Sequence, residues 1–134
     1  MLTIKQQLSI SDQLSVNARI VEKLKEQVSF ESLIGYKLCG ADQFIKLSAE
    51  PFYYRSTSLL KYLLQNPRGV KHLVKYYSKM KKRDSVKPPK NVGASSFILV
   101  KILRTLEAAE LIAHNDKGYY TARKGRMILK QCLD

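Results

Sequence analysis

The most restrictive feature of this sequence is an abrupt change of apolar spacing near residue 111. Before it, apolar side chains recur every three or four positions, which predicts an amphipathic helix over residues 96–112 capped by Ser95. The side chains expected on its buried stripe are Leu99, Ile102, Leu103 and Leu106. Such a stripe indicates a helix that packs on a core through this one face.

The residues after this helix predict a β-hairpin. Residues 111–114 form a short apolar strand pattern, and Gly118 closes a polar turn at a position suited to a positive φ. Tyr119 and Tyr120 are expected in the return strand. Thr121 is then expected to cap a last helix.

Helical patterns also precede this region. Residues 11–28 predict one helix, and Ser29 is positioned to cap a short second one. Because Pro51 interrupts the pattern that follows, a third helix is expected to begin near Ser56 or Thr57.

A fourth helix is predicted over residues 70–82, after a turn at residues 66–69. It has two stripes on opposite sides. The apolar stripe consists of Val70, Leu73, Val74 and Tyr77, and the basic stripe includes Lys71, Lys75, Lys79 and Lys82. Residues 81–94 read as a polar connector, which Pro88 and Pro89 stiffen toward polyproline II.

The order of these elements is typical of a winged helix-turn-helix protein. The predicted fold is therefore mainly α, a winged helix-turn-helix core with a short β-hairpin wing and extra N-terminal helices. We expect a single domain over residues 1–134, with neutral N-terminal helices in residues 1–54 and the winged-helix core in residues 55–134. The alternative is an unrelated helical bundle that carries one hairpin.

The net charge of the chain is concentrated in one segment. The chain carries 24 basic and 11 acidic side chains, a net charge of +13. Residues 1–54 are neutral and residues 91–134 carry +3, whereas residues 55–90 carry +10 with Asp84 as their one acid. Because such a charge density repels itself unless something neutralises it, the segment predicts a surface for a polyanion, against the simpler reading of a solvated lysine-rich face.

Candidate catalytic and metal-binding groups are few. The chain has no phosphate-binding loop and no nucleophile elbow motif, and neither His72 nor His114 has metal-ligating neighbours at a useful spacing. Glu107 and Glu110 share a helix face, which is better read as solvated than as an acid–base pair. We therefore expect no enzyme, no metal, no cofactor and no small-molecule substrate.

The two cysteines and the apolar runs bear on the compartment. Cys39 and Cys132 are far apart and suggest no disulfide framework, which suits a reducing environment. No signal peptide is visible, and the longest apolar run, residues 97–100, is far too short to cross a bilayer. We expect a cytosolic or nuclear protein that does not interact with membranes.

The basic side chains are the candidate binding site, because Lys and Arg along a surface contact the phosphates of a nucleic acid backbone. Tyr76 lies beside the basic stripe and is placed to stack on a base or ribose, whereas Tyr77 is expected in the core. The predicted nucleic-acid-binding residues are Arg55, Lys61, Arg68, Lys71, Lys75, Lys79, Lys81, Lys82, Arg83, Lys87, Lys90, Lys101 and Arg104.

The predicted helix 96–112 is poor in side chains that read bases. It begins with Ser95, Ser96, Phe97 and Ile98, and its Lys101 and Arg104 come later than base-reading residues usually do. This favours recognition of backbone and shape, as in RNA binding. The alternatives are a winged-helix DNA-binding transcription regulator and a protein-interaction module whose basic face meets an acidic partner.

The motifs of the middle region resemble the ribosomal protein S19e family of the eukaryotic and archaeal small subunit. The first is Phe52-Tyr53-Tyr54-Arg55-Ser56-Thr57-Ser58. It is followed by Gly69-Val70 with Leu73, Lys75 and Tyr77, by Pro88, by residues 102–107 and by Thr121 with Gly125. The sequence departs from the family pattern at Pro51, where a tryptophan is usual, and at Ser78-Lys79, where the family has two glycines and where the helix is expected to continue.

The resemblance implies a winged-helix-like protein in the head of the small ribosomal subunit. It implies contacts with small-subunit rRNA and neighbouring ribosomal proteins, and a role in maturing the rRNA precursor. By position, Arg55, Lys61 and Lys101 would face rRNA. The expected location is the cytoplasmic ribosome, with passage through the nucleolus during assembly if the protein is eukaryotic.

Overall fold

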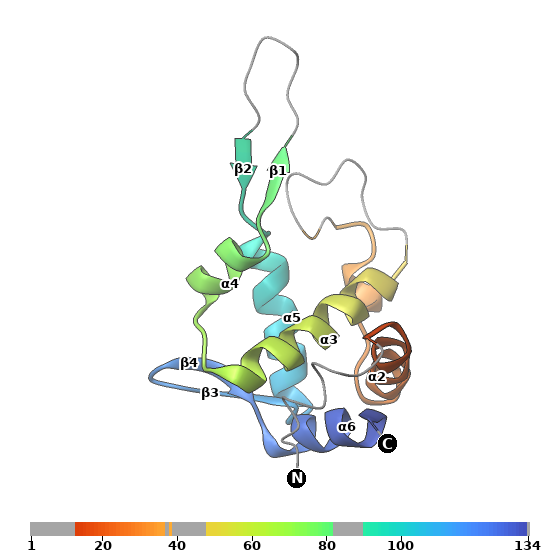
Figure 1. Ribbon diagram of the computed structural model, residues 1–134. Coiled ribbons are helices and arrows are strands. Elements are labelled where there is room, and N and C mark those ends of the chain that lie inside the picture. Colours follow the sequence, from red (N-terminus) through yellow and green to blue (C-terminus); the bar gives the residue numbers. More distant parts are fainter. Residues whose placement is uncertain (1–12, 37, 39–47, 82–89, 134) are drawn as a thin grey trace.

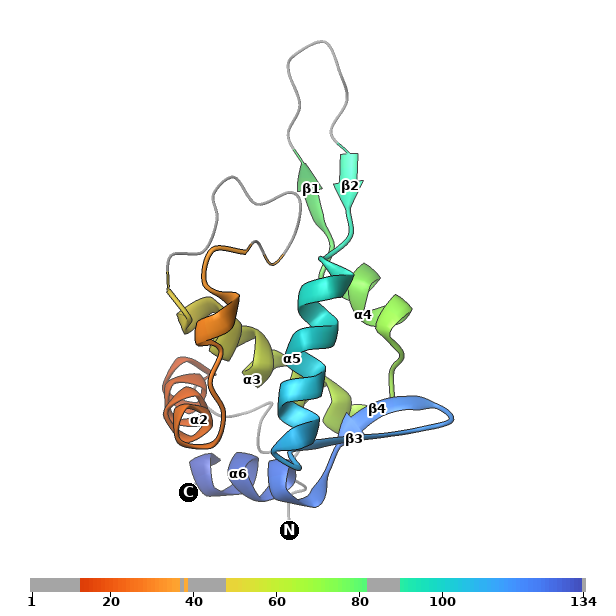
Figure 2. The same ribbon diagram turned by 180° about the vertical axis from the view of Figure 1, so that it is seen from behind.

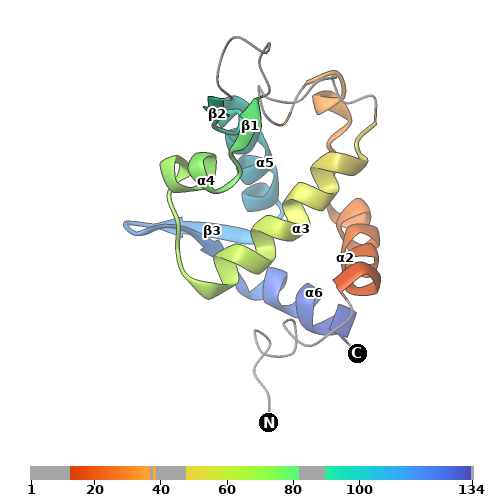
Figure 3. The ribbon, with the colours of Figure 1, turned by 45° about the horizontal axis from the view of Figure 1, so that its top comes forward.

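Helix α3 (Glu50–Gln65) runs through the middle of the fold, and the other main elements pack around it (Figures 1 and 3). It contacts α2 (Gln13–Gln27), α5 (Ser96–Ala108), α6 (Arg123–Leu133) and strand β4 (Gly118–Thr121). These contacts come from a computed structural model of the chain, which describes residues 13–36, 38, 48–81 and 90–133.

The remaining elements are short. A 3-10 turn covers Glu31–Leu33, and helix α4 covers Val70–Tyr76. Strand β1 (Lys79–Lys81) pairs antiparallel with β2 (Lys90–Val92), and β3 (Ile112–Asn115) pairs antiparallel with β4. In Figure 1 the first hairpin extends from the top of the helical body, and the second projects at its left beside the start of α4.

The structure confirms a mainly helical, winged-helix-like fold. Helices α3, α4 and α5 form the helical core, and the β3–β4 hairpin is the wing (Figure 2). The linker between α3 and α4 joins the wing through an isolated bridge, in which Arg68 and Tyr119 exchange two backbone hydrogen bonds of 2.9 and 2.8 Å. The predicted division at residues 54 and 55 falls inside α3.

The four apolar residues predicted for the buried stripe of α5 are all buried. In α2, Val16, Ile20, Val21 and Leu24 are buried, whereas Ala18, whose apolar spacing also predicted a buried position, is exposed. Ser95 caps α5 as expected, because the amide of Ile98 donates to its hydroxyl at 3.4 Å. Burying each large apolar side chain contributes about 1.5–3 kcal/mol, so these stripes supply much of the folding free energy.

The wing has the predicted turn, although one predicted cap is wrong. Gly118 adopts a φ of +123°, and the side chain of Asn115 accepts a hydrogen bond of 2.9 Å from the amide of Lys117. Thr121 does not cap α6. It ends strand β4, and its buried hydroxyl donates to the carbonyl of Leu60 at 2.7 Å, which ties the wing to α3.

Helix α3 begins earlier than the sequence suggested. We expected its start near Ser56 or Thr57, with Pro51 as a break, but the helix begins at Glu50 and Pro51 lies in its first turn. Proline is tolerated there because the first amides of a helix have no partner within the helix. Glu50 also accepts a hydrogen bond from Lys25, which raises the pKa of that lysine.

The prediction of a helix over residues 70–82 is wrong beyond Tyr76. Tyr77 ends α4, and residues 79–81 form the first arm of the upper hairpin instead of a helical turn and connector. Antiparallel pairing with residues 90–92 supplies backbone hydrogen bonds to residues 79–81 in an extended conformation. Lys82, Pro88 and Pro89 lie outside the described residues.

Three smaller expectations also differ. Ser29 caps no helix, because only a 3-10 turn follows and no side chain caps it. Helix α5 ends at Ala108 and not at residue 112, and Glu110 turns the chain toward the wing with a φ of +65°. Ser11, where the first helix was expected to begin, lies outside the described residues, and Thr57, where the third helix was expected to begin, is buried within α3, where its hydroxyl donates to the carbonyl of Tyr53.

Replacement of Gly125 by alanine is expected to destabilise the protein by about 1–3 kcal/mol. Gly125 is buried in α6, and a Cβ at this position would lie 2.5 Å from the carbonyl oxygen of Leu111. Urea unfolding measures the effect. Lys124→Ala places the same residue at the exposed neighbouring position and should unfold like the parent; equal stability of both variants would contradict the packing described.

Candidate nucleic-acid interface

An aromatic cluster covers the outer surface where α3 meets α4. The Tyr62 and Tyr76 rings stack with their centroids 3.9 Å apart and their planes at 8°. His72 lies beside Tyr62, and its Nε2 is 2.5 Å from the Tyr62 hydroxyl. Tyr77 meets the Tyr76 ring edge to face at 4.9 Å, so four rings from two helices form one assembly.

Tyr77 connects this cluster to the core and to Arg55. The Arg55 guanidinium lies 3.9 Å from the centroid of the Tyr77 ring, a cation–π contact, and the Tyr77 hydroxyl is 2.8 Å from that of Ser58. Burial raises the pKa of Tyr77 to about 12. The predicted core position of Tyr77 is confirmed, since it packs against the hydrophobic core.

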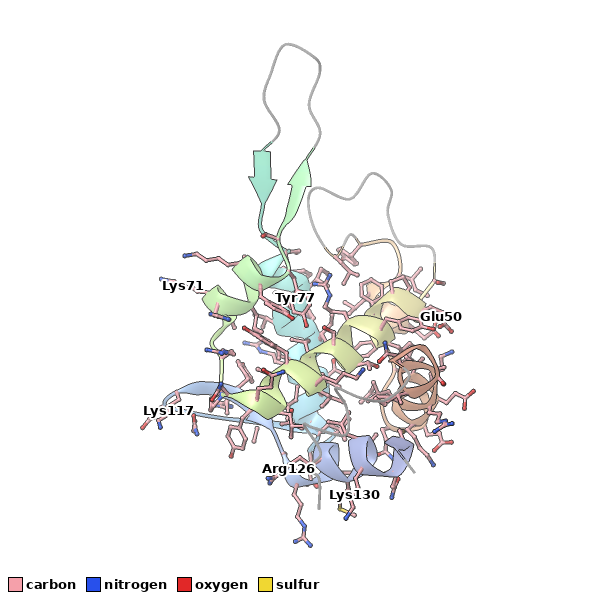
Figure 4. The ribbon with its side chains drawn as sticks, in the orientation of Figure 1. Glu50, Lys71, Tyr77, Lys117, Arg126 and Lys130 are labelled. Carbon is pink, nitrogen blue, oxygen red and sulfur yellow. The ribbon has the colours of Figure 1, made fainter. Side chains whose placement is uncertain are left out.

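Other predicted cations surround the same rings. The Arg68 guanidinium lies 5.5 Å from the Tyr62 ring centroid, and its buried Nε has no hydrogen-bond partner among the described residues. Lys71 and Lys75 are exposed on α4, and Figure 4 shows Lys71 pointing outward from that helix. A buried donor without a partner is unusual in a folded protein, so Arg68 is a candidate for an interaction with a bound group.

A shallow depression of about 230 Å³ opens beside the cluster, between α2, α3 and α4. Tyr54 and Gln65 line it together with the stacked rings, and its floor holds Lys61, which donates a hydrogen bond to Asn17 of α2. Burial lowers the pKa of Lys61. No acidic side chain is among the described residues that line it.

The described strands of the upper hairpin contain three further predicted residues, Lys79, Lys81 and Lys90. Lys81 and Lys90 are directly opposite each other in the β1–β2 register, and Lys79 is opposite Val92. The other predicted residues of this segment, Lys82, Arg83 and Lys87, lie outside the described residues.

Helix α5 carries its two predicted residues on a different side of the molecule. Lys101 and Arg104 are exposed, and the opposite face of α5 packs against α3 and α4. Helix α5 is behind α3 in Figure 1 and in front of it in Figure 2. The structure therefore brings Arg55, Lys61 and Arg68 to the tyrosines of α3 and α4, exposes Lys71 and Lys75 on α4, and leaves Lys101 and Arg104 on a different side.

Several residues of this surface were not predicted from the sequence. Tyr54, Ser58, Tyr62 and Gln65 lie at i, i+4, i+8 and i+11, a polar and aromatic stripe opposite the leucines of α3, which helical periodicity could have revealed. His72 and Asn17 become part of this surface only through tertiary packing.

A second basic group, also unpredicted, lies on α6. It consists of the exposed residues Arg123, Lys124, Arg126 and Lys130 (Figure 4).

Features of other kinds of site are absent from the part of the chain that the structure describes. No group of three or more His, Cys, Asp or Glu side chains is arranged to hold a metal ion there. His114 pairs with Glu107 at 2.6 Å on the exposed side of the wing. None of the described helices combines the length and the apolar character needed to cross a membrane.

Comparison with known proteins gives two matches. A model of the family described as Ribosomal protein S19e matches residues 13–134. A stretch of 68 residues is 37% identical to the small ribosomal subunit protein eS19B of Drosophila melanogaster. That alignment covers 50% of this chain and 43% of the relative, so it spans less than half of the relative's length.

The raised pKa of Tyr77 predicts a pH-dependent component of stability. Its hydroxyl is protonated below pH 10 in both the folded and unfolded states, and between pH 10 and about 12 it ionises only in the unfolded state. Stability from this group is therefore present below pH 10 and is lost as pH rises toward 12, by about 2 kcal/mol. Urea midpoints from pH 9 to 11.5 should fall more steeply for the parent than for Tyr77→Phe; parallel curves would contradict this.

Proposed function

This chain belongs to the ribosomal protein S19e family, and we propose that it is a structural constituent of the small ribosomal subunit that binds small-subunit rRNA. The protein is a non-catalytic RNA-binding component that works with neighbouring ribosomal proteins. It acts in the cytoplasm on the ribosome and takes part in maturing the subunit, passing through the nucleolus if the organism is eukaryotic.

The observation that supports this proposal is the position of Arg55, Lys61 and Arg68 at the tyrosines of α3 and α4, on a surface where α4 also exposes two predicted lysines. Lys71 and Lys75 are exposed there, and the guanidinium groups of Arg55 and Arg68 lie over tyrosine rings. Guanidinium groups held on rings keep their outer N–H groups oriented, which suits recognition of phosphate oxygens. Such a surface follows an RNA backbone more readily than it reads base edges in a duplex groove.

The two sides of the molecule then have separate roles. The surface of α3 and α4, together with the β1–β2 hairpin, binds one stretch of backbone, and Lys101 with Arg104 on α5 contacts another. A protein with basic groups on opposite sides holds RNA segments together, which is a structural role in a folded RNA. The start of α5 presents Ser96 and Phe97, which are poor donors for reading DNA bases.

The affinity for a small-subunit rRNA fragment should fall steeply with salt. If about six phosphates are contacted, the log–log slope is roughly −4 to −5. Lys71→Glu combined with Lys75→Glu should weaken binding by roughly tenfold or more and reduce the slope by about 2. Fluorescence anisotropy titrations between about 50 and 300 mM salt measure the affinity and the salt slope. Over this range the Debye length falls from about 14 to about 6 Å.

The matched control is Lys23→Glu combined with Lys117→Glu, which makes the same change of net charge on exposed positions of α2 and of the wing turn. It should retain most of the affinity. A flat salt response in the parent protein, or equal losses in the two double variants, would count against the proposed surface.

Sedimentation tests the assignment to the small subunit. A tagged copy of the full chain, expressed in cells of its own organism, should migrate with small subunits on a sucrose gradient at physiological salt. The Lys71→Glu, Lys75→Glu double variant should shift toward the top of the gradient. Recovery of the parent protein only in the soluble fractions would refute the ribosomal role.

A further inference from the structure

The depression beside the aromatic cluster has the features of a binding site for a nucleobase. Three tyrosines line it, and two of them keep about half of their surface exposed, with Tyr54 at 49% and Tyr76 at 51%. The exposure of aromatic rings to water is unfavourable, and a nucleobase that stacks on them with its flat face removes this exposed surface. Their grouping on a strongly basic surface points to a planar ligand attached to an anionic backbone.

The stacked pair of rings is already assembled. Tyr62 and Tyr76 come from different helices, yet their planes differ by only 8° and their centroids are 3.9 Å apart. The hydrogen bond between Tyr62 and His72 holds the first ring in place. A base that stacks here therefore meets a preformed platform and does not have to order the side chains itself.

Polar groups around the rings can recognise the edge of a base. Gln65 is exposed at the rim and offers both an amide donor and an acceptor, and Asn17 offers a second amide beside it. Lys61 holds Asn17 in position by donating to its Oδ1. Amide side chains next to aromatic faces are the usual means of binding an unpaired base in RNA.

The volume of the depression limits the size of the ligand that it can bind. Its volume of about 230 Å³ is below the roughly 300–1,000 Å³ of pockets that enclose drug-sized ligands. It therefore accommodates one ring system and leaves the sugar and phosphate outside, on the basic surface. A paired base within a duplex cannot enter, because its face is covered by its neighbours in the stack.

We propose that this depression captures one unpaired nucleobase of RNA, stacked on Tyr76, which is itself supported by the Tyr62 ring, and contacted at its edge by Gln65 and Asn17. The inference rests on the proposed function, because the RNA backbone has to be held on the surrounding basic surface. It adds to that function a preference for RNA in which a single nucleotide is flipped out of a helix.

The test uses the full chain and two RNA hairpins of equal length and charge. One hairpin carries a single bulged 2-aminopurine, and the other has the same nucleotide paired. The chain contains no tryptophan, so the probe's fluorescence is read without a strong protein signal. We expect roughly tenfold tighter binding of the bulged hairpin and quenching of the probe by stacking.

Substitution of Tyr76 by alanine should reduce this preference to about one and abolish the quenching, and Tyr76→Phe should restore both because it keeps the ring. Tyr36→Ala is the matched control, since Tyr36 is equally exposed, at 49%, and is not among the residues that line the depression. It should keep the tenfold preference. Adenosine monophosphate is the probe for a free nucleotide and should not compete at concentrations that match the RNA.

The outcomes separate the two proposals. Equal affinity for both hairpins with a steep salt dependence would overturn the base site and leave RNA binding intact. Binding of neither hairpin would overturn both. Quenching that persists in Tyr76→Ala, or efficient competition by adenosine monophosphate, would also overturn the base site in the form proposed here.

Discussion

Burial of the inner face of α3 is the interaction on which the rest of the molecule depends. Leu59, Leu60 and Leu63 are almost completely buried, and α2, α5, α6 and β4 contact the same helix. Because one side of α3 is committed to the core, its other side is held at a fixed angle to α4. The aromatic cluster and its cations can therefore exist as one preorganised surface, although Tyr62 and Tyr76 belong to different helices.

The elements that the sequence predicted well have strong local signals. A serine cap and a regular apolar stripe located α5, and a glycine suited to positive φ located the wing turn. The errors occurred where tertiary contacts decide the outcome. Pro51 is compatible with either a break or a first helical turn, and Glu50 gains a partner only when α2 packs nearby. The lysines from residue 79 onward fit a helical stripe as well as a strand, and the pairing with residues 90–92 is visible only in the folded chain.

The sequence was sufficient to predict the basic character of the candidate site, but it predicted the positions of the site residues only in part. Segmental charge identified the basic region, and helical spacing placed Lys71 and Lys75 on the outer side of α4. The same reasoning could not separate Lys101 and Arg104 from that group, because the side of α5 that faces solvent depends on how it packs against α3. Asn17 is 44 residues from Lys61 in the sequence, so no local pattern links them.

The backbone bridge between Arg68 and Tyr119 has a mechanical consequence. Two hydrogen bonds join the linker between α3 and α4 to strand β4 of the wing. The Thr121 hydroxyl joins the same strand to α3. The linker before α4, strand β4 and helix α3 are therefore each connected to the other two. These connections restrict bending more than a flexible linker would. A displacement of the wing is therefore transmitted to the backbone of Arg68, so the position of this residue and the orientation of the β3–β4 hairpin are coupled.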